Sequence, residues 1–453
     1  MIKNRIGQIL RTKEIDELNN KNNDLLCKLE YLSEKIDAYA DLFSQKHAEI
    51  VNSISDCNEF LSLDNVFLIN KNIRVLICGF YGARNLGDEL MLNAVLKRLD
   101  SVGIDATVML ANNHDLDASI YFPHSIVHYP RKSLDVTFLA EQFDVIIWGG
   151  GAVIDDENYR FKENEVGLTY ILCALSKAIL KKGGKVIALG VSSNKELSNT
   201  RFIKDMDYIV KNATYFSLRD KYSLETLKNS GIRIDNVKII DDLALSDIVP
   251  GNPIKTTDEK VVIGLVYVMD DNKRDLLIKY TNSLVEMIKK EYGADRAIDL
   301  RLIPFYDYNN NDKKRFIEIK EKCLTDLPEN VRIIEVDYMN DIEELVDEFM
   351  HCGYVVSMRY HATLIAGCLG VNVLAIDLSE THRHYHNKLK YVKEKYCPEL
   401  ISFSYGKPVD EFVEALRALF KKPRQKTLDA DILRALSDNT KNAIEEALKY
   451  IKN

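Results

Sequence analysis

The sequence has little that would tie it to a membrane, and no apolar run approaches the roughly 18 residues that a bilayer span needs. The stretch from Met1 to Lys13 has no apolar core of the kind that a signal peptide carries. The eight cysteines include no Cys-x-x-Cys pair, which excludes a disulfide scaffold and a cysteine-rich zinc site. We therefore expect a cytoplasmic protein with no transmembrane segment. Peripheral binding at the inner face of the membrane is the minor alternative.

Positive charge is in the minority. Lys and Arg number 61 against 69 Asp and Glu, so the net charge is −8. That balance excludes a general cationic coat for nucleic acid but allows a local basic pocket for a small anion. Hydrophobic residues make up 46% of the chain and charged residues 29%, which is typical of a soluble globular protein.

The length of 453 residues allows two or three domains at about 150 residues each. We expect a helical N-terminal extension over residues 1–68. A first lobe would follow over residues 69–250. A second lobe, with the terminal helices, would cover residues 251–453.

The extension has no proline and, up to about residue 65, no glycine after Gly7. Apolar residues recur there at alternating spacings of four and three, as in a heptad seam. They are Leu25, Leu29, Leu32, Ile36, Tyr39 and Phe43. Two interpretations stay open. One is a parallel coiled coil that would make the protein a homo-oligomer, and the other is a helical hairpin packed on its own body.

From Ile73 on, short apolar strands alternate with amphipathic helices, which indicates βαβ units and parallel sheets. The predicted strands are 74–78, 106–110, 144–148, 185–189, 215–218, 237–240, 261–268, 299–303, 331–336, 354–357 and 372–376. The predicted helices are 88–99, 168–182, 276–291, 362–368, 409–420 and 428–451. A polar linker over 246–260 separates two series of similar size. We expect an α/β fold of two doubly wound, Rossmann-like lobes that face a cleft, with ligands at the carboxyl ends of the strands.

The first strand runs into a glycine-rich loop with the sequence GFYGARNLGDE, residues 79–89. Gly82 and Gly87 let the backbone approach a ligand, and the start of the following helix offers N–H groups to an anion. The spacing fits neither G-x-G-x-x-G nor a Walker loop. We expect Asn85, Asp88 and Glu89 in the cleft. A tight turn followed by a capped helix is the structural alternative.

Three glycines, Gly149, Gly150 and Gly151, follow the apolar strand DVIIW. Glycines at the carboxyl end of a strand let a substrate approach the backbone, and we favour that interpretation over close packing of the next helix. The acidic run at 155–157 lacks the spacing of a metal site, so a solvated loop is the better interpretation.

Arg219 stands where a predicted strand gives way to a helix that Asp220 would cap. An arginine at this place can bind an anion through two parallel hydrogen bonds from its guanidinium. A surface ion pair is the equal alternative.

The segment Ser357-Met358-Arg359-Tyr360-His361 is the sharpest motif. An apolar strand ends there in Arg-x-His and runs straight into an apolar helix. A fixed cation and a titratable imidazole at a helix start suit an anionic substrate. Although a lone histidine is usually structural, Arg359 two residues away favours a functional His361.

Downstream, His382, His384 and His386 alternate with other residues. They lack a nearby carboxylate or cysteine set, so we expect no metal site. A basic loop at the rim of the cleft, with Lys388 adding charge to an anion pocket, is the better interpretation.

These motifs, in this order, resemble the polysaccharide pyruvyl transferase family. The resemblance covers about residues 73–392 and is carried by GFYGARNLGDE, DVIIWGGG, SLRDKYS and MRYHATLIAGCLGVNVLAI. The chain departs from the family at one point. Members of the family often have Asp-Pro after the strand that corresponds to 237–240, whereas this chain has Asp242 followed by Leu243.

The resemblance implies a GT-B-like fold and transfer of pyruvate from phosphoenolpyruvate to a sugar of a surface polysaccharide, commonly as a ketal. Phosphoenolpyruvate is a co-substrate, and no cofactor is expected. The resemblance places Arg219 and Arg359 on the donor, one from each lobe. His361 is the expected general acid/base, and Asp88 or Glu89 would orient or deprotonate the acceptor, whose identity and lipid linkage stay open.

Two other functions stay open. A nucleotide-sugar glycosyltransferase of the same architecture would need a carboxylate for the ribose in the second lobe, for which Asp377 and Glu380 are candidates. A non-catalytic scaffold built on the heptad segment would make the residues of the cleft dispensable.

Overall fold

The computed structural model describes residues 73–110, 124–130, 133–162, 165–193, 196–249, 260–268, 274–292, 296–307, 311–378, 388–423 and 430–452. The chain divides into two compact units, Met1–Asn72 and Ile73–Asn453, and the fold below is that of the second unit. The predicted heptad seam lies outside the described residues, as does most of the linker. The histidines at 382, 384 and 386 also lie outside them.

The first lobe is a parallel sheet flanked by helices. Its strands lie in the order β10-β9-β8-β4-β1-β2-β3, and β5 pairs with β8. The strands are β1 (Val75–Tyr81), β2 (Ala106–Leu110), β3 (Ser125–His128), β4 (Val145–Trp148), β5 (Gly151–Ile154), β8 (Lys185–Ser193), β9 (Tyr215–Leu218) and β10 (Val237–Ile239), with a small hairpin of β6 (Phe161–Lys162) and β7 (Glu165–Val166). The helices are α2 (Leu86–Ser101), α3 (Ser133–Glu141), α4 (Leu168–Lys181), α5 (Thr200–Asn212) and α6 (Lys221–Asn229), with the 3-10 helix η2 (Leu243–Leu245).

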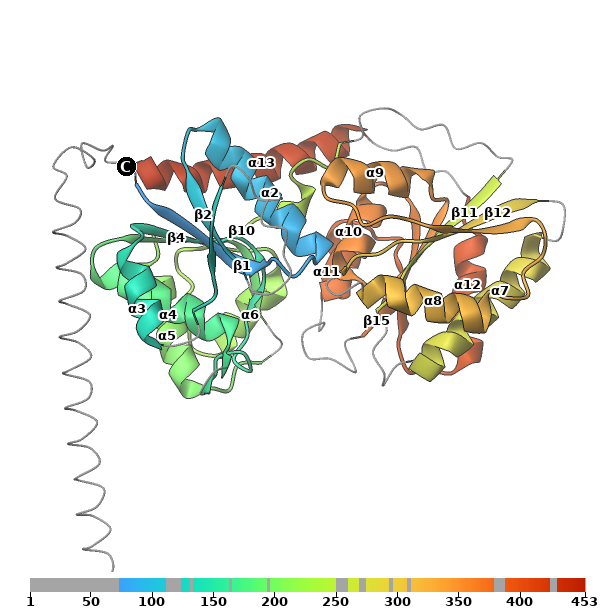
Figure 1. Cartoon of the computed structure of the whole chain (residues 1–453), viewed down its shortest axis with the longest axis horizontal. Helices are drawn as coiled ribbons and strands as arrows, with labels where there is room; N and C mark the ends of the chain where they lie inside the picture. The colour runs from blue at the N-terminus through green and yellow to red at the C-terminus, as the bar shows by residue number, and fades with distance from the viewer. Residues whose placement is uncertain are drawn as a thin grey trace, which may run out of the picture. The chain divides into compact units, whose positions relative to one another are not determined.

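The central strands β1 and β4 are buried on both faces because they are apolar at nearly every position rather than at alternate ones, whereas the edge strands β3 and β10 are partly exposed. Val75 and Ile77 of β1 pack with α2 on one face, whereas Leu76 and Cys78 pack with α4 and α5 on the other. Figure 1 shows α2 on one side of the sheet and α3, α4 and α5 on the opposite side.

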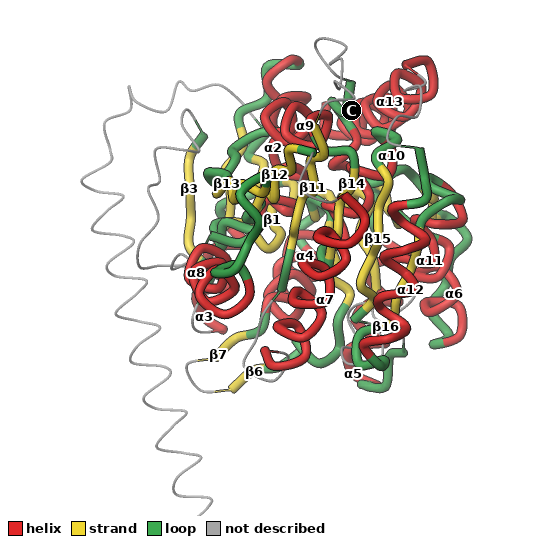
Figure 2. Tube along the Cα trace, turned by 90° about the vertical axis from the view of Figure 1, so that its right-hand side faces the viewer, coloured by secondary structure: helices red, strands yellow, loops and turns green. Residues whose placement is uncertain are grey.

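The second lobe is built on the same plan. Its strands lie in the order β13-β12-β11-β14-β15-β16, all parallel. Figure 2 faces this lobe and shows β11, β14 and β15 side by side. The strands are β11 (Lys260–Val266), β12 (Ala297–Leu302), β13 (Val331–Glu335), β14 (Tyr354–Ser357), β15 (Asn372–Asp377) and β16 (Ile401–Ser404). The helices are α7 (Arg274–Tyr292), α8 (Asn311–Cys323), α9 (Ile342–His351), α10 (Tyr360–Cys368), α11 (Lys388–Lys395) and α12 (Val409–Phe420).

The expected pair of doubly wound lobes is therefore confirmed, and the two lobes share a core. One hydrophobic cluster runs from Leu86 of α2 and Leu243 of η2 in the first lobe to Val266, Leu345 and Leu364 in the second. Burial of this continuous apolar surface holds the lobes together.

The two terminal helices divide between the lobes. Helix α12 packs against α7, β15 and β16 of the second sheet. Helix α13 (Ala430–Lys452) instead packs against α2, β8 and η2 of the first lobe, where Ser437 Oγ donates a hydrogen bond of 2.6 Å to the carbonyl of Ser246. Figure 1 shows α13 beside α2. The end of the chain therefore returns to the first lobe.

Each sheet has one place where the strand order reverses. In the first sheet, β2 and β3 extend to one side of β1, and β4, β8, β9 and β10 extend to the other. In the second sheet, the reversal falls between β11 and β14. Ligands of open α/β sheets bind at such a crevice, outside the carboxyl ends of the strands. The glycine loop after β1, the glycines after β4 and the Arg-x-His segment after β14 all lie at these two points.

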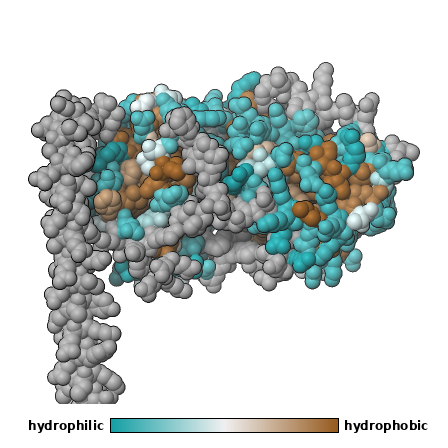
Figure 3. Space-filling view, viewed as in Figure 1, coloured by the Kyte–Doolittle hydropathy of each residue, from teal (hydrophilic) through white to brown (hydrophobic). Residues whose placement is uncertain are grey.

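The surface of the described residues carries several exposed apolar side chains, among them Phe138 on α3 and Ile317 on α8. Figure 3 shows hydrophobic patches among hydrophilic residues on both lobes. Among the described residues, no helix is both long and apolar enough to cross a membrane.

Candidate active site

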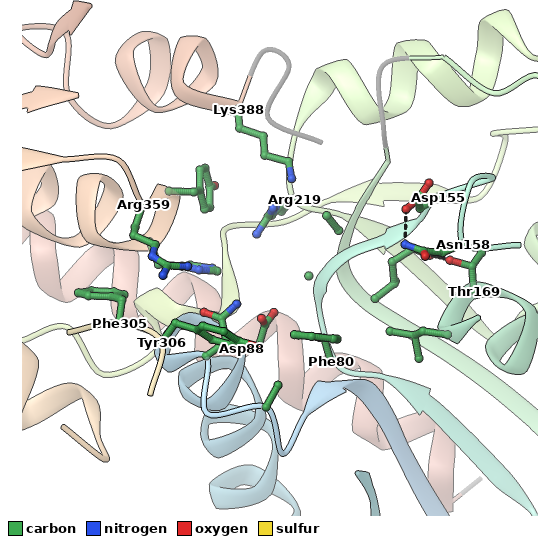
Figure 4. Close-up of a pocket in the computed structure, with 18 of the residues that line it drawn as sticks. Phe80, Asp88, Asp155, Asn158, Thr169, Arg219, Phe305, Tyr306, Arg359 and Lys388 are labelled. Atoms are coloured by element: carbon green, nitrogen blue, oxygen red, sulfur yellow. Dashed lines mark hydrogen bonds between the residues drawn. The ribbon is translucent and has the colours of Figure 1, made fainter. Parts of the chain in front are cut away.

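A cavity of about 550 Å³ opens between the carboxyl ends of the two sheets (Figure 4). Both lobes line it. The first lobe contributes Phe80, Ala83, Asn85, Asp88, Tyr129, Gly151, Ala152, Val153, Asp155, Asn158, Leu168, Thr169 and Arg219. The second lobe contributes Phe305, Tyr306, Arg359, Tyr360, His361 and Lys388. The structure thus brings Asn85, Asp88, Gly151, Arg219, Arg359, His361 and Lys388 together, as the sequence predicted for one cleft.

Arg219 and Asp242 form a buried ion pair at the carboxyl ends of neighbouring strands β9 and β10. Nη1 of Arg219 lies 2.9 Å from Oδ2 of Asp242, and the two side chains are 3% and 1% exposed. The guanidinium also lies over the ring of Tyr360, 4.4 Å from its centre. The alternative of a surface ion pair is therefore wrong, because this guanidinium is fixed inside the protein and lines the cavity.

The same carboxylate faces His361. Oδ1 of Asp242 lies 3.6 Å from Nε2 of His361 and accepts a hydrogen bond of 3.0 Å from the backbone N–H of Ala244. Burial acts to raise the pKa of Asp242, but the charges of His361 and Arg219 outweigh it and lower that pKa. Asp242 is thus an anion that holds a guanidinium with one oxygen and faces an imidazole with the other.

The ring of His361 packs against the first helix of the opposite lobe. A Cβ atom on Gly87 would lie only 1.8 Å from Nδ1 of His361. Because Gly87 has no side chain, the imidazole can lie directly on the first turn of α2. Gly87 was expected on the cleft surface. In the structure it is the contact surface on which the imidazole of His361 packs.

Arg359 is positioned by α8. Its Nη2 lies 2.8 Å from Oδ1 of Asp312, and its guanidinium lies 5.6 Å from the ring centre of Tyr306. The second oxygen of Asp312 accepts the backbone N–H groups of Phe305 and Tyr306, both at 2.8 Å. One buried carboxylate therefore fixes both the arginine and the loop beside it.

Lys388, the first residue of α11, adds a third cation. Burial, followed by the charge of Arg219, lowers its pKa to about 7. Figure 4 shows its side chain directed toward Arg219 across the cavity. Cations crowded in a water-poor site are stabilised when an anion enters between them.

Of the two predicted acidic residues, only Asp88 lines the cavity. Burial raises the pKa of Asp88 to about 6, against the opposing charges of His361 and Arg219. Glu89 is absent from the lining among the described residues. Its Oε1 accepts a hydrogen bond of 2.9 Å from the backbone N–H of Gly82, which has a φ of 79°. Glu89 and Gly82 therefore stabilise the turn before α2.

The three glycines after β4 serve two purposes. Gly149 and Gly150 allow close packing, because a Cβ would lie 2.1 Å from Oη of Tyr81 at the first and 2.8 Å from Sδ of Met91 at the second. Gly151 has a φ of 85° and lines the cavity, where a Cβ would lie 3.2 Å from Oδ1 of Asp88. Gly149 and Gly150 thus allow close packing against β1 and α2 rather than against the next helix, and the ligand interpretation fits Gly151.

The interpretation of the acidic run as a solvated loop is wrong for Asp155. This residue is 1% exposed and lines the cavity. Its Oδ1 accepts the backbone N–H of Glu157 at 3.0 Å, and its Oδ2 accepts a hydrogen bond from the amide of Asn158. Those two donors hold the carboxylate in place, which the sequence pattern did not show.

Backbone hydrogen bonds join the lobes beside the cavity. The N–H of Leu86 donates to the carbonyl of Phe305 at 2.9 Å, and the N–H of Asp307 donates to that of Arg84 at 3.1 Å. The side chains of Arg84 and Asp307 form an ion pair of 2.9 Å. The glycine loop therefore fixes the position of the second lobe as well as that of α2.

A family model described as polysaccharide pyruvyl transferase matches residues 85–380, which is more than half of the chain. No curated protein sequence matches the chain significantly.

Solved structures resemble the fold at low sequence identity. A UDP-GlcNAc 2-epimerase from Methanocaldococcus jannaschii is 13% identical, with a TM-score of 0.50 over 84% of this chain and 99% of that one. S. aureus MnaA in a co-structure with UDP is 11% identical, with a TM-score of 0.52 over 84% and 95%. A glycosyltransferase from Rickettsia africae is 11% identical, with a TM-score of 0.50 over 84% and 98%. At these identities the likeness shows the fold alone, and it confirms the GT-B-like arrangement.

Proposed function

The chain belongs to the polysaccharide pyruvyl transferase family, and on that premise we propose that it moves pyruvate from phosphoenolpyruvate to a sugar of a surface polysaccharide or its precursor. The product would be a ketal that bridges two hydroxyl groups of that sugar. The observation that best supports this proposal is that Arg219, Arg359 and Lys388 line the same cavity as His361.

The donor would be bound by these cations. Phosphoenolpyruvate carries a phosphate and a carboxylate on adjacent positions of a three-carbon skeleton, so it needs several positive groups close together. A guanidinium binds either anion with two parallel hydrogen bonds. Arg219 is fixed by Asp242 and Arg359 by Asp312, so both are already oriented before the donor arrives.

The chemistry needs one acid and one base. In the first step, His361 would give a proton to the methylene carbon of the donor, while a sugar hydroxyl forms a bond to its central carbon. Asp88 would accept the proton of that hydroxyl, for which a pKa of about 6 is suitable. In the second step, the bond to phosphate breaks, the phosphate leaves with its electron pair, and the second hydroxyl bonds to the same carbon. The proton of that hydroxyl returns to His361 or leaves with the phosphate.

Asp242 would act as a positioning residue. It touches His361 and Arg219 at the same time, so it links the orientation of the acid to that of the donor-binding guanidinium. A carboxylate behind an imidazole also stabilises the positive charge that the ring carries before proton transfer.

The alternative donor, a nucleotide sugar, is supported less well. The described residues of the second lobe that line the cavity are aromatic or basic and include no carboxylate for a ribose. Asp377 is not among them, and Glu380 lies outside the described residues.

The proposal can be tested on the full chain with two donors. We expect calorimetry to show binding of phosphoenolpyruvate, and weaker binding by Arg359→Ala. With an extract of polysaccharide precursors, we expect phosphate release and a new acceptor species with the mass of a pyruvate ketal. No binding of phosphoenolpyruvate, or release of a nucleoside diphosphate from a sugar nucleotide instead, would contradict the proposal.

A further inference from the structure

The cavity is divided by charge. Its cations lie where the two lobes meet, but the wall that continues into the first lobe has a different character (Figure 4). We define the first-lobe wall as Phe80, Tyr129, Val153, Asp155, Asn158, Leu168 and Thr169. Among these described residues there is no Lys or Arg, and the wall carries one carboxylate. It is therefore unsuited to an anionic donor.

Phe80 gives this wall an apolar surface. It lies in β1, where every other residue is buried, yet 41% of its own surface is exposed. Figure 4 shows the ring of Phe80 below the space between Asp88 and the Asp155 side of the cavity. An exposed aromatic ring inside a cavity, with polar groups around it, is suited to a flat apolar face edged by hydroxyls.

Asp155 gives the wall a carboxylate whose position is fixed. Both carboxylate oxygens are held by internal donors, the N–H of Glu157 and the amide of Asn158. Because the amide nitrogen of Asn158 is directed to Asp155, the orientation of Asn158 is fixed as well. A carboxylate accepts hydrogen bonds from sugar hydroxyls but repels a second anion.

We propose that the first-lobe wall binds an uncharged sugar ring of the acceptor and disfavours a ring that carries a carboxylate or phosphate. The ring stacks on Phe80 and directs hydroxyls to Asp155 and Asn158. Gly151, which also lines the cavity, lies against Asp88, so a ring bound on this wall and extending over Gly151 places another hydroxyl beside the base. This inference rests on the proposed function, because that function makes the second substrate a sugar.

The test measures sugar binding without the donor. Neutral methyl hexopyranosides of the gluco, galacto and manno series are compared with the matched methyl hexuronosides by saturation-transfer NMR on the full chain. We expect at least one neutral glycoside to bind, and its matched hexuronoside to bind at least about tenfold more weakly. Phe80→Ala should weaken neutral binding about tenfold. Asp155→Asn should reduce the discrimination between the matched pair to about threefold or less.

The control is Phe138→Ala, which removes an aromatic ring that is 60% exposed on α3 and does not line the cavity. Thermal melting checks that every variant is folded. No binding of any neutral glycoside, equal effects of the two phenylalanine variants, or unchanged discrimination in Asp155→Asn would each overturn the inference.

Donor binding is measured separately, by calorimetry with phosphoenolpyruvate alone. If phosphoenolpyruvate fails to bind while neutral glycosides bind through Phe80, the proposed function is wrong and the sugar site stands. If phosphoenolpyruvate binds and the glycosides do not depend on Phe80 or Asp155, the sugar site is wrong and the proposed function stands.

Discussion

Nε2 of His361, in the second lobe, lies 3.6 Å from Oδ1 of Asp242, in the first. The imidazole therefore belongs to α10 but is oriented by the other lobe, in which Asp242 faces the ring and Gly87 packs against it. Asp242 also holds Arg219. The cluster of His361, Arg219 and their shared partner Asp242 therefore forms only when the two lobes are in contact.

We predict that His361→Ala lowers turnover by roughly 10²–10⁴-fold and leaves donor affinity largely intact, because the cations rather than the imidazole bind the donor. His361→Gln should not restore turnover, since an amide supplies no proton at neutral pH. Turnover and calorimetric donor affinity are measured on variants that melt like the wild type. Near-normal turnover in His361→Ala would point instead to Lys388, to His382 or His384, or to bound water as the proton source.

We predict that donor binding depends on both lobes. Replacing Arg219 or Arg359 by Ala should each weaken binding of phosphoenolpyruvate by about 2–5 kcal/mol, because each removes one side of a desolvated charge pair. Arg233→Ala is the control, since it removes an arginine that pairs with Asp207 at the surface. Calorimetry at one pH compares the three variants. Unchanged affinity in Arg219→Ala and Arg359→Ala would exclude both as donor ligands.

Much of this site could be predicted from local sequence patterns. The predicted strands and the helices that follow β1, β4 and β14 are present, because continuous apolar runs and glycine turns are local signals. Arg219, Arg359 and His361 could be predicted for the same reason, since the first two lie between a strand and the next helix and His361 lies in the first turn of a helix.

The partners of those residues could not be predicted. Asp242 reaches Arg219 only because β9 and β10 are neighbours, and Asp312 reaches Arg359 from α8, a polar helix that no apolar pattern indicated. The sequence did contain one signal, because Asp242 follows a strand as the family aspartate does. The sequence also could not tell which glycines line the cavity and which allow close packing. Packing against Tyr81, Met91 or His361 depends on contacts between residues far apart in the chain.

We predict that donor affinity decreases as the pH rises above 7. The pKa of Lys388 is lowered to about 7, so this cation is present below that pH and is lost above it. Binding of an anion favours the protonated form, which makes affinity proton-linked. We expect affinity to fall roughly tenfold between pH 7 and pH 9, where the donor itself no longer titrates. Lys388→Arg should remove most of this dependence, whereas Lys390→Arg, an exposed residue two positions along α11, should keep it. Equal pH profiles for the two variants would contradict the assignment.

We predict that the charge of Asp88 costs stability. Its folded-state pKa is about 6, above the ordinary value of 3.8, so the folded protein holds this proton more tightly than the unfolded chain does. The stabilisation is complete below pH 3.8 and is lost as the pH rises through 6. Asp88→Asn should therefore unfold with a free energy about 1–3 kcal/mol higher than wild type at pH 7.5, and this gain should disappear near pH 4. It should also lose turnover.

The comparison uses Asp100→Asn, a carboxylate at the far end of the same helix whose side chain is 53% exposed. Urea unfolding at pH 4, 6 and 7.5 measures both variants. For Asp100→Asn, we expect the free energy of unfolding relative to wild type not to increase with pH. If Asp88→Asn were no more stable than wild type at pH 7.5, the burial of this charge would not be costly, and its role as a base with a raised pKa would lose its support.

The last prediction concerns Gly87, against which the imidazole of His361 packs. In Gly87→Ala, the new Cβ would lie 1.8 Å from Nδ1 of His361, so the ring must leave its position. Alanine is otherwise favoured over glycine within a helix by about 1 kcal/mol. We therefore expect Gly87→Ala to destabilise the protein when His361 is present and to be neutral or stabilising in a His361→Ala background, because the obstructing ring is then gone. Urea unfolding of the four proteins gives the coupling energy directly, and we expect it to exceed about 1 kcal/mol. Turnover of the single variant should fall nearly as far as that of His361→Ala while donor affinity is kept. Additive effects on stability, together with normal turnover in Gly87→Ala, would show that the ring does not depend on this helix for its position.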